Sequence, residues 1–318
     1  MRTALARPAP PLRLRLPATS ANLGPGFDAA AGALDLWLEI EARAAERFSL
    51  RAAGRDRGLC AALENNLLLE TYREVLAEAD VAAPPLALRI RNEIPLGKGC
   101  GSSAAARLAA IQLAAHFGRL RWPAERILAA AARREGHADN AAACWHGGFV
   151  CVAPRDRSPQ GESGGWAVVA GAAPRWPLLL AVPRQPLATE EARAILPAAY
   201  SRADAVANLQ AGMQLAAAFL LDRRELLAAG MRDHWHEPYR ERRCPLLTAL
   251  KPLAGTPEAA GVCLSGAGPS VLLVPARGVS LARLRQRAAA RLREAGLQAE
   301  LIATRLAPHG AGWGWKPA

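Results

Sequence analysis

The sequence predicts an α+β fold in which antiparallel sheet packs under helices. Leu86, Leu88 and Ile90 alternate with arginines, which predicts a half-buried strand, and the alanine-rich segment that follows it predicts a long helix. Towards the carboxyl end, patterns typical of strand, loop, strand, helix and strand follow one another. This order is typical of an antiparallel sheet that is covered by helices.

The amino-terminal half shows two strand patterns and two helix patterns around a glycine-rich break. The break runs from Glu93 to Ser102, directly after the first strand. Pro123 precedes the second helix, at the position where proline is favoured at a helix entrance. The predicted helices are Ser103–Phe117 and Ala124–Glu135, and the second predicted strand is Gly147–Ala153.

The carboxyl-terminal half has strand patterns at Trp176–Val182 and at Val262–Val274, the second of which is interrupted by the sequence SGAGPS. Leu281–Ala295 is amphipathic with helical spacing, and Gln298–Leu306 is a final strand pattern.

The chain has 318 residues, which is enough for two ordinary domains. The stretch Ala153–Gly165 is rich in Pro, Gly, Ser and charge, as connections between domains are. We therefore expect an amino-terminal domain at residues 1–155 and a carboxyl-terminal domain at residues 156–318.

Cysteine spacing and hydropathy favour a soluble, cytoplasmic protein. The six cysteines form no CxxC pair and no zinc-type spacing, so we expect reduced, mostly buried thiols. The segment MRTALARPAPPLRLRL has no continuous apolar core and no cleavage site, and no later run approaches the roughly 18 apolar residues that span a bilayer. We expect no membrane association.

The formal net charge of +12 raises the alternative of a nucleic-acid or anionic-surface binder. The arginines are scattered singly, aromatic residues are few, and no pattern interleaves base-stacking groups with charge. We interpret the excess charge as a solvated surface and expect no nucleic-acid partner.

The glycine-rich sequence PLGKGCGSSAAA has the features of a phosphate site. Gly97, Gly99 and Gly101 keep side chains away from the backbone N–H groups, and Ser102 and Ser103 begin a predicted helix whose positive end attracts anions. The glycines alone are a weak signal of a phosphate site, and a simple tight turn remains the alternative. The segment matches neither GxxxxGK[ST] nor GxGxxG, which disfavours a Walker-type NTPase and a Rossmann enzyme.

Two further segments, PATSANLGPGFD (Pro17–Asp28) and LSGAGPS (Leu264–Ser270), flank this loop in the sequence. Together the three segments resemble the ordered motifs of the GHMP kinases, the superfamily of galactokinase, homoserine kinase, mevalonate kinase and phosphomevalonate kinase. Three motifs in the right order and at the right spacing make the match specific, and it extends over nearly the whole chain.

The resemblance implies a ribosomal-protein-S5-like amino-terminal domain joined to a ferredoxin-like carboxyl-terminal domain. It implies ATP and Mg²⁺ as cofactors, with the last motif, Ser265, Gly266 and Gly268, beside the substrate and phosphate. The ATP-binding residues that it implies are Pro95, Leu96, Gly97, Gly99, Gly101, Ser102 and Ser103.

Four local matches resemble the homoserine kinases within this superfamily. In the first motif, the resemblance implies that Asn22 and Asp28 hold an amino-acid substrate, Asp28 by its ammonium group; shaping a turn is the alternative. The sequence EGHADN resembles the family's EGHPDN, which implies Mg²⁺ binding by Glu135, together with Ser102, and substrate contacts by His137 and Asn140. Mg²⁺ suits this choice because it takes hard oxygen ligands and only one or two carboxylates.

The other two matches are TEEARAILP (Thr189–Pro197) and HEPYRERRCP (His236–Pro245). They imply substrate contacts by Thr189, Arg193 and Arg240, with Gly266 from the last motif. A helix N-cap explains Thr189 equally well, but it does not explain Arg193. Two arginines and one aspartate suit a zwitterionic amino acid, because a guanidinium binds a carboxylate through two hydrogen bonds.

The resemblance implies ATP-dependent phosphorylation of the L-homoserine hydroxyl to O-phospho-L-homoserine, a step of threonine biosynthesis, by a homodimer. Phosphoryl transfer has a loose transition state, so positioning and charge neutralisation contribute most of the catalysis. We expect Asn140, with His137, to orient the hydroxyl and Glu135 to act through Mg²⁺; Asp139 is a disfavoured candidate base. Another GHMP kinase, such as an L-threonine kinase, and an idle binding protein on the same fold are the alternatives.

Overall fold

The computed structural model describes residues 9–155, 165–187 and 189–315, and its two sheets with their helices confirm the α+β class. The first sheet has the strand order β3-β4-β2-β5-β6, and β1 pairs with β2 outside this path. Neighbouring strands of this sheet run antiparallel, except β3 and β4, which run parallel. The strands are β1 (Leu12–Asn22), β2 (Gly26–Ala44), β3 (Ser49–Gly54), β4 (Leu86–Asn92), β5 (Phe149–Pro154) and β6 (Trp166–Gly171).

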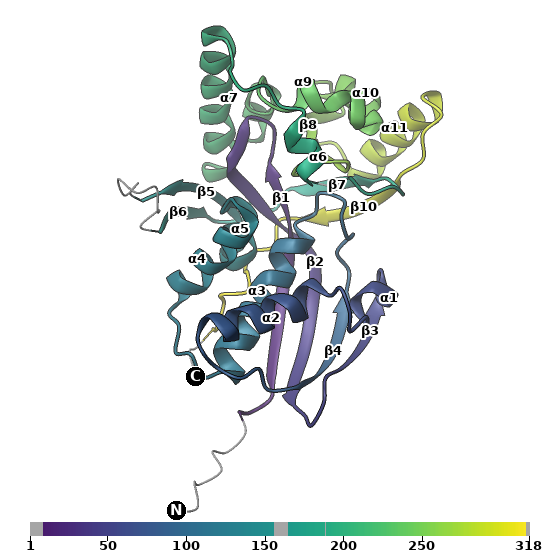
Figure 1. Cartoon of the computed structure of the whole chain (residues 1–318). Coiled ribbons are helices and arrows are strands. Elements are labelled where there is room, and N and C mark those ends of the chain that lie inside the picture. The colour runs from purple at the N-terminus through teal and green to yellow at the C-terminus, as the bar shows by residue number, and fades with distance from the viewer. Residues whose placement is uncertain (1–8, 156–164, 188, 316–318) are drawn as a thin grey trace, which may run out of the picture.

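Helices α2 to α5 gather beside this sheet, where α3 and α5 contact β1 and β2, and α2 packs on α3 (Figure 1). Helix α3 is buried on nearly all sides from Ala104 to Phe117. Its many alanines allow this, because small side chains let neighbouring helices approach closely. The short α1 follows β3. The bounds are α1 (Arg57–Cys60), α2 (Leu67–Glu78), α3 (Ser102–Phe117), α4 (Ala124–Glu135) and α5 (Asp139–His146).

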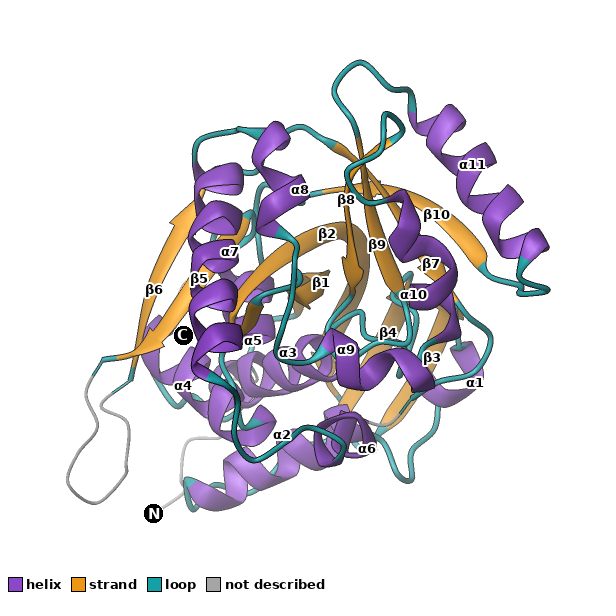
Figure 2. Cartoon of the chain, turned by 90° about the horizontal axis from the view of Figure 1, so that it is seen from above, coloured by secondary structure: helices purple, strands orange, loops and turns teal. Residues whose placement is uncertain are grey.

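The second sheet is antiparallel, in the order β10-β7-β9-β8, and its two faces pack against different partners. Alternate residues of β7 show this: Leu179 packs under α10 and α11, whereas Leu178 and Leu180 join the core of the first sheet. Figure 2 shows α10 and α11 beside these strands. The strands are β7 (Pro177–Val182), β8 (Ala259–Leu264), β9 (Val271–Pro275) and β10 (Glu300–Arg305), and the helices are α10 (Pro245–Leu250) and α11 (Leu281–Glu294).

Between β7 and α10 the chain forms the helices that flank the junction of the two sheets. The long helix is α7, and its N-cap Ser201 accepts a hydrogen bond from the backbone N–H of Asp204. The helices are α6 (Thr189–Ala194), α7 (Arg202–Leu220), α8 (Leu227–Gly230) and α9 (Glu237–Arg240), with single 3-10 turns at Arg224–Leu226, Glu241–Arg243 and Lys251–Leu253.

The predicted elements are confirmed, with bounds that shift by at most three residues. The helix at Ala124–Glu135 has the predicted bounds, and the interrupted pattern at Val262–Val274 forms the hairpin β8–β9. All six cysteines are free thiols, and four of them are buried. In the described part of the chain, no helix combines the length and the apolar character that crossing a membrane would need.

The predicted domain boundary lies in the connection between β5 and β6, of which residues 156–164 fall outside the described part. Strands β5 and β6 pair with each other in the first sheet, so this sheet continues beyond residue 155. The segment after β10 also returns to it, since Leu306 bridges to Leu34. The division at 155/156 stays a prediction. The pairing of β6 with β5 indicates that the chain crosses from the first sheet to the second after Gly171.

Candidate active site

The glycine-rich loop between β4 and α3 lies against the last motif. Gly97, Gly99 and Gly101 have positive φ angles of 65°, 74° and 65°. A Cβ atom on Gly99 would lie 2.1 Å from the carbonyl oxygen of Ser265, and one on Gly101 would lie 1.8 Å from Oγ1 of Thr19. Both glycines are therefore required by conformation and by close packing.

The three motifs meet through hydrogen bonds at this loop. Ser265 Oγ donates to the carbonyl oxygen of Gly99 at 2.7 Å, and the N–H of Gly266 donates to Ala21 O at 3.0 Å. Asn22 Nδ2 donates back to Gly266 O at 2.9 Å. The first and last motifs, more than 240 residues apart, are thus held against the loop that separates them in the sequence.

Glu135 ends α4 and its carboxylate reaches the start of α3. Ser103 Oγ donates to Oε2 at 2.9 Å, and Arg107 Nη1 donates to Oε1 at 2.6 Å. The Glu135 side chain is 6% exposed. Ser102 Oγ, nearby, accepts from the N–H of Gly97 at 3.4 Å. A carboxylate and hydroxyls are the hard oxygen ligands that Mg²⁺ prefers, so these residues fit the ion.

His137, Asp139 and Asn140 follow at the turn into α5. His137 Nδ1 is 2.5 Å from Asp139 Oδ1, which also accepts the N–H of Asn140 at 2.7 Å. Burial lowers the pKa of His137, but the hydrogen bond and the charge of Asp139 outweigh it and raise the pKa above its ordinary value of 6.5. Asn140 Oδ1 accepts from Thr19 Oγ1 at 2.5 Å. Oδ2 of Asp139 is buried and has no hydrogen-bond partner among the described residues.

Asp28 and Arg193 form a bidentate ion pair in the site. Nη2 of Arg193 is 2.6 Å from Oδ1 of Asp28, and Nη1 is 3.0 Å from Oδ2. The hydrogen bond to Asp28 raises the pKa of Arg193, against the effect of burial. Asp28 also donates its backbone N–H to Asn22 Oδ1 at 3.1 Å. A carboxylate O of Asp28 and one of Asp139 lie within 4.8 Å of a ring nitrogen of His137 and of each other.

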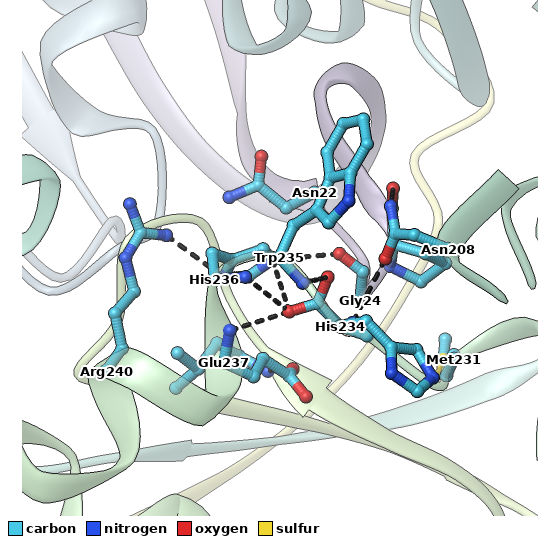
Figure 3. A network of polar contacts seen from close by, with 12 residues as sticks. Asn22, Gly24, Asn208, Met231, His234, Trp235, His236, Glu237 and Arg240 are labelled. Carbon is cyan, nitrogen blue, oxygen red and sulfur yellow. Dashed lines mark hydrogen bonds and ion pairs between the residues drawn. The ribbon is translucent and has the colours of Figure 1, made fainter. Parts of the chain in front are cut away.

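Arg240 is the largest fully buried side chain of the described chain, at 1% exposure. Its Nε donates to Ala192 O at 2.9 Å. Its Nη1 donates to His236 Nδ1 at 3.1 Å (Figure 3). His236 in turn donates from Nε2 to Gly24 O at 2.8 Å, so its ring is neutral. Burial and the charge of Arg193 lower the pKa of Arg240. None of the ion pairs in the described part of the chain includes Arg240.

These groups line one cavity of about 400 Å³. Pro95 and Leu96 do not line it, and the N–H of Leu96 donates to Asp56 instead. Thr189 begins α6, but its side chain lies outside the described part. A larger cavity of about 920 Å³ lies by Trp37 and Trp315 and contains no motif residue. Predicted site residues lining the smaller cavity are Asn22, Asp28, Gly97, Gly99, Gly101, Ser102, Ser103, Glu135, His137, Asn140, Arg193, Arg240 and Gly266.

The sequence interpretation missed two arginines that line this cavity, Arg107 and Arg134. Arg107 follows Ser103 by one helical turn, and this spacing places both on the face of α3 that meets Glu135. Arg134 bonds outward to Glu78, and its backbone oxygen accepts a hydrogen bond from Arg107. The i, i+4 spacing was the available signal.

The loop, the helix amino end and the acidic and basic groups around one cavity define a small-molecule kinase site on a GHMP-type fold. Residues 66–148 match the family model described as GHMP kinases N terminal domain. The homoserine kinase of Solibacter usitatus is 43% identical over 83% of this chain and 85% of its own, and that of Carboxydothermus hydrogenoformans is 33% identical over 93% and 94%. The chain therefore belongs to the homoserine kinase family of the GHMP kinases.

Solved structures agree with this assignment of the fold. A structure from Listeria monocytogenes described as a homoserine kinase has a TM-score of 0.70 and 28% identity, and the superposition covers 94% of this chain and 97% of that one. The homoserine kinase of Cytophaga hutchinsonii has a TM-score of 0.75 at 24% identity and covers 98% of both chains, which supports the shared fold.

Proposed function

We propose that this chain transfers the γ-phosphoryl group of ATP to the side-chain hydroxyl of L-homoserine, giving O-phospho-L-homoserine. The observation that carries the amino-acid assignment is the buried guanidinium of Arg240, which lines the cavity without a carboxylate partner in the described chain. A buried cation without a counter-ion is costly, so a ligand carboxylate would stabilise it.

The opposite charge of the substrate also has a matching group. Asp28 and Asp139 present carboxylate oxygens within 4.8 Å of each other, and Oδ2 of Asp139 is buried without a donor from the described part of the chain. An ammonium group has three N–H donors and fits between two such acceptors. Acceptors on one side and the guanidinium of Arg240 on the other therefore suit the two ends of an amino acid, with Asn22, Thr189, Arg193 and Gly266 as further contacts.

The glycine-rich loop suits the triphosphate of ATP. We assign the triphosphate to the N–H groups of Gly97, Gly99 and Gly101 and to the amino end of α3, which carries a partial positive charge. Ser102 and Ser103 begin this helix, and the hydroxyl of Ser102 is a further donor. Glu135 with Ser102 would hold Mg²⁺, which when bound neutralises charge on the phosphate oxygens.

We assign the orientation of the acceptor hydroxyl to Asn140, with His137 beside it. Thr19 donates to Oδ1 of Asn140, which identifies the other end of this side chain as the amide nitrogen. This nitrogen would donate to the hydroxyl oxygen. His137, held by Asp139, is a further donor when protonated. A strong base is not needed, because the hydroxyl proton is lost late when the transition state is loose. The cytoplasmic location and the homodimer stay predictions.

A coupled assay of ADP release tests the proposal. The acceptors are L-homoserine, L-threonine, shikimate, mevalonate and galactose, each with MgATP. We expect the highest kcat/KM for L-homoserine. L-Threonine carries the same ammonium and carboxylate, so it is the second candidate. A tenfold preference for threonine or mevalonate over homoserine would contradict the proposal, and salt-sensitive DNA binding without ADP release would favour a binding protein.

A further inference from the structure

The side chain of Thr19 lies behind the candidate active site rather than in it. Thr19 belongs to β1 and is 0% exposed. In the described structure it does not line the cavity of about 400 Å³ that holds the site residues. Thr19 is therefore not placed to contact ATP or the acceptor, and any effect on the reaction must pass through a neighbouring residue.

Two hydrogen bonds join Thr19 to two parts of the site. Strand β1 contacts both α3 and α5, which also contact each other (Figure 1). The backbone N–H of Thr19 donates to Cys100 O in the glycine-rich loop at 3.0 Å, and Oγ1 donates to Oδ1 of Asn140 at 2.5 Å. Thr19 thus connects the loop that we assign to the triphosphate with the residue that we assign to the acceptor hydroxyl.

Gly101 lets the hydrogen bond between Thr19 and Asn140 form close to the amino end of α3. A Cβ atom on Gly101 would lie 1.8 Å from Oγ1 of Thr19 and 3.1 Å from Oδ1 of Asn140. Gly101 is also the N-cap of α3, with a φ angle of 65°. Because a side chain at this position would displace both partners, the glycine is needed for the contact itself as well as for the turn.

The same place in the structure favours one orientation of the Asn140 amide. The oxygen and nitrogen ends of an asparagine side chain have nearly the same shape, so packing alone does not choose between them. The amino end of α3 carries a partial positive charge, which favours the oxygen beside it. The Thr19 hydroxyl donates to that same oxygen. Both features hold Oδ1 on the side of the loop and leave the amide nitrogen for the cavity.

The backbone of Asn140 is held separately. Its N–H donates to Oδ1 of Asp139 at 2.7 Å, at the start of α5. What this contact leaves free is rotation of the half-buried Asn140 side chain, which lines the cavity. The hydrogen bond from Thr19 restricts that rotation.

We propose that Thr19 is a positioning residue for phosphoryl transfer: its hydroxyl fixes the amide of Asn140 so that the acceptor hydroxyl meets the γ-phosphate in line. The inference deepens the proposed function and rests on it for the role of Asn140. Because Thr19 is also bonded to the glycine-rich loop, it sets the acceptor relative to the phosphate donor. Misplacing reacting groups by about 1 Å can slow a reaction about a hundredfold.

Removal of the hydroxyl tests the proposal. Thr19→Val keeps the shape of the side chain, so kcat with L-homoserine should fall about ten- to a hundredfold while the KM for ATP hardly changes. Thr19→Ser keeps the hydroxyl and should recover most of the native kcat. A folded Thr19→Val variant with native kcat, or a folded Thr19→Ser variant as slow as Thr19→Val, would overturn the proposal.

Ser20 offers a matched control. It is the next residue of β1, is also 0% exposed, and its Oγ has no hydrogen-bond partner among the described residues. Successive side chains of a strand point to opposite faces, so Ser20→Ala removes a buried hydroxyl away from Asn140 and should keep the native kcat. Thermal unfolding accompanies each variant, and Thr19→Ala takes the place of Thr19→Val if the latter does not fold. An equal loss of kcat in Ser20→Ala would reduce the effect to packing of β1 and overturn the proposal.

A double-mutant cycle tests whether Thr19 acts through Asn140. In an Asn140→Ala background, Thr19→Val should lower kcat no further, because the amide that it positions is already absent. Calorimetry should give native ATP affinity for Thr19→Val, since the backbone bond to Cys100 O is kept. Additive losses of kcat, or weakened ATP binding, would show that Thr19 acts through the loop instead, which would overturn the proposal.

The acceptor panel, measured first on the native protein, separates this inference from the proposed function. If another acceptor is preferred to L-homoserine, the proposed function fails, and the cycle is measured with that acceptor, where coupling of Thr19 to Asn140 would still support the positioning role. If L-homoserine is phosphorylated and the cycle shows no coupling, the positioning role alone fails. A native protein that phosphorylates no acceptor of the panel would contradict both.

Discussion

The carboxylate of Asp28 and the guanidinium of Arg193 neutralise each other across the cavity, although 165 residues separate them in the chain. Under the proposed function they bind opposite ends of the same zwitterion. A bound amino acid would exchange this internal pair for two contacts of its own, from its ammonium to Asp28 and from its carboxylate to Arg193. Each of the two residues is then paired both before and after the substrate binds, so neither half-buried charge is left without a counter-charge.

The methyl ester of homoserine should therefore be a poor substrate. It keeps the ammonium but lacks the carboxylate charge that would replace Asp28 beside Arg193. We expect kcat/KM about ten- to a hundredfold below that of the acid, since charge-assisted contacts contribute roughly 1.5–3 kcal/mol. In Arg193→Ala the preference for the acid should narrow, whereas Arg202→Ala, an exposed arginine at the start of α7, should keep the native preference. An equal preference in both variants would remove Arg193 from the carboxylate contact.

Arg240→Ala should reduce kcat/KM for homoserine about ten- to a hundredfold while the KM for ATP hardly changes. Arg240→Lys should recover only part of the loss, because an ammonium keeps the charge but loses the planar fork. The matched control is Arg242→Ala, two residues on and exposed. Thermal unfolding must accompany the kinetics, because Arg240 is buried. Native kinetics in folded Arg240→Ala would leave the substrate assignment without its main physical support.

Substitutions of Glu135 and of Arg107 should shift the Mg²⁺ concentration for half-maximal rate in opposite directions. Glu135→Gln removes the charge that suits the ion, so turnover should fall severely and the Mg²⁺ concentration for half-maximal rate should rise. Arg107→Met removes the guanidinium that now pairs with Glu135 at 2.6 Å, so this concentration should fall. Titration of Mg²⁺ at fixed ATP, together with Mg²⁺-dependent ATP binding by calorimetry, measures both. Shifts in the same direction would separate Arg107 from the metal site.

Gly99→Ala should weaken both folding and ATP binding. Its positive φ would be strained by about 1 kcal/mol, and its Cβ would lie only 2.1 Å from Ser265 O, so the last motif must move away from the loop. Gly296→Ala is the control, because Gly296 also has a positive φ, of 68°, but open space around it. We expect a larger fall in melting temperature for Gly99→Ala, and lost ATP affinity for this variant alone. Equal falls with native ATP affinity would make the loop a simple turn.

Two histidines should give stability profiles of opposite slope with pH. The pKa of His137 is raised above 6.5, so its contribution is fully present below pH 6.5 and is lost as the pH rises through the folded-state pKa. Burial lowers the pKa of His146 below 6.5, so stability is lost as the pH falls below that value. Chemical denaturation of His137→Gln and His146→Gln across pH 5–8 should remove one slope each. A His137→Gln profile parallel to the native one would contradict the raised pKa.

Local signals predicted the elements and most of the cavity. Periodicity placed α4, and glycine-rich motifs placed the loop, because both depend on residues adjacent in the chain. Arg107 was missed because its i, i+4 spacing from Ser103 does not reveal which residue the two side chains face. That residue is Glu135, at the end of α4. The Asp28–Arg193 pair was missed as a pair for the same reason.

The extent of the first sheet was also not predictable from composition. The polar stretch before β6 has the composition of a linker, but the strand after it returns to pair with β5. Pairing depends on which strand edge is free in the folded chain, and composition does not record this.

The hydrogen bonds that tie Ser265 and Gly266 to Gly99, Ala21 and Asn22 join the two sheets at the floor of the cavity. A rotation that separates the two sheets would break all three, one at the phosphate loop and two at the first motif. Helix α6, by contrast, is held to the first motif by the ion pair of Arg193, whose side chain is 38% exposed. The amino acid should therefore enter and leave from the side of α6, while the floor stays closed through the whole catalytic cycle.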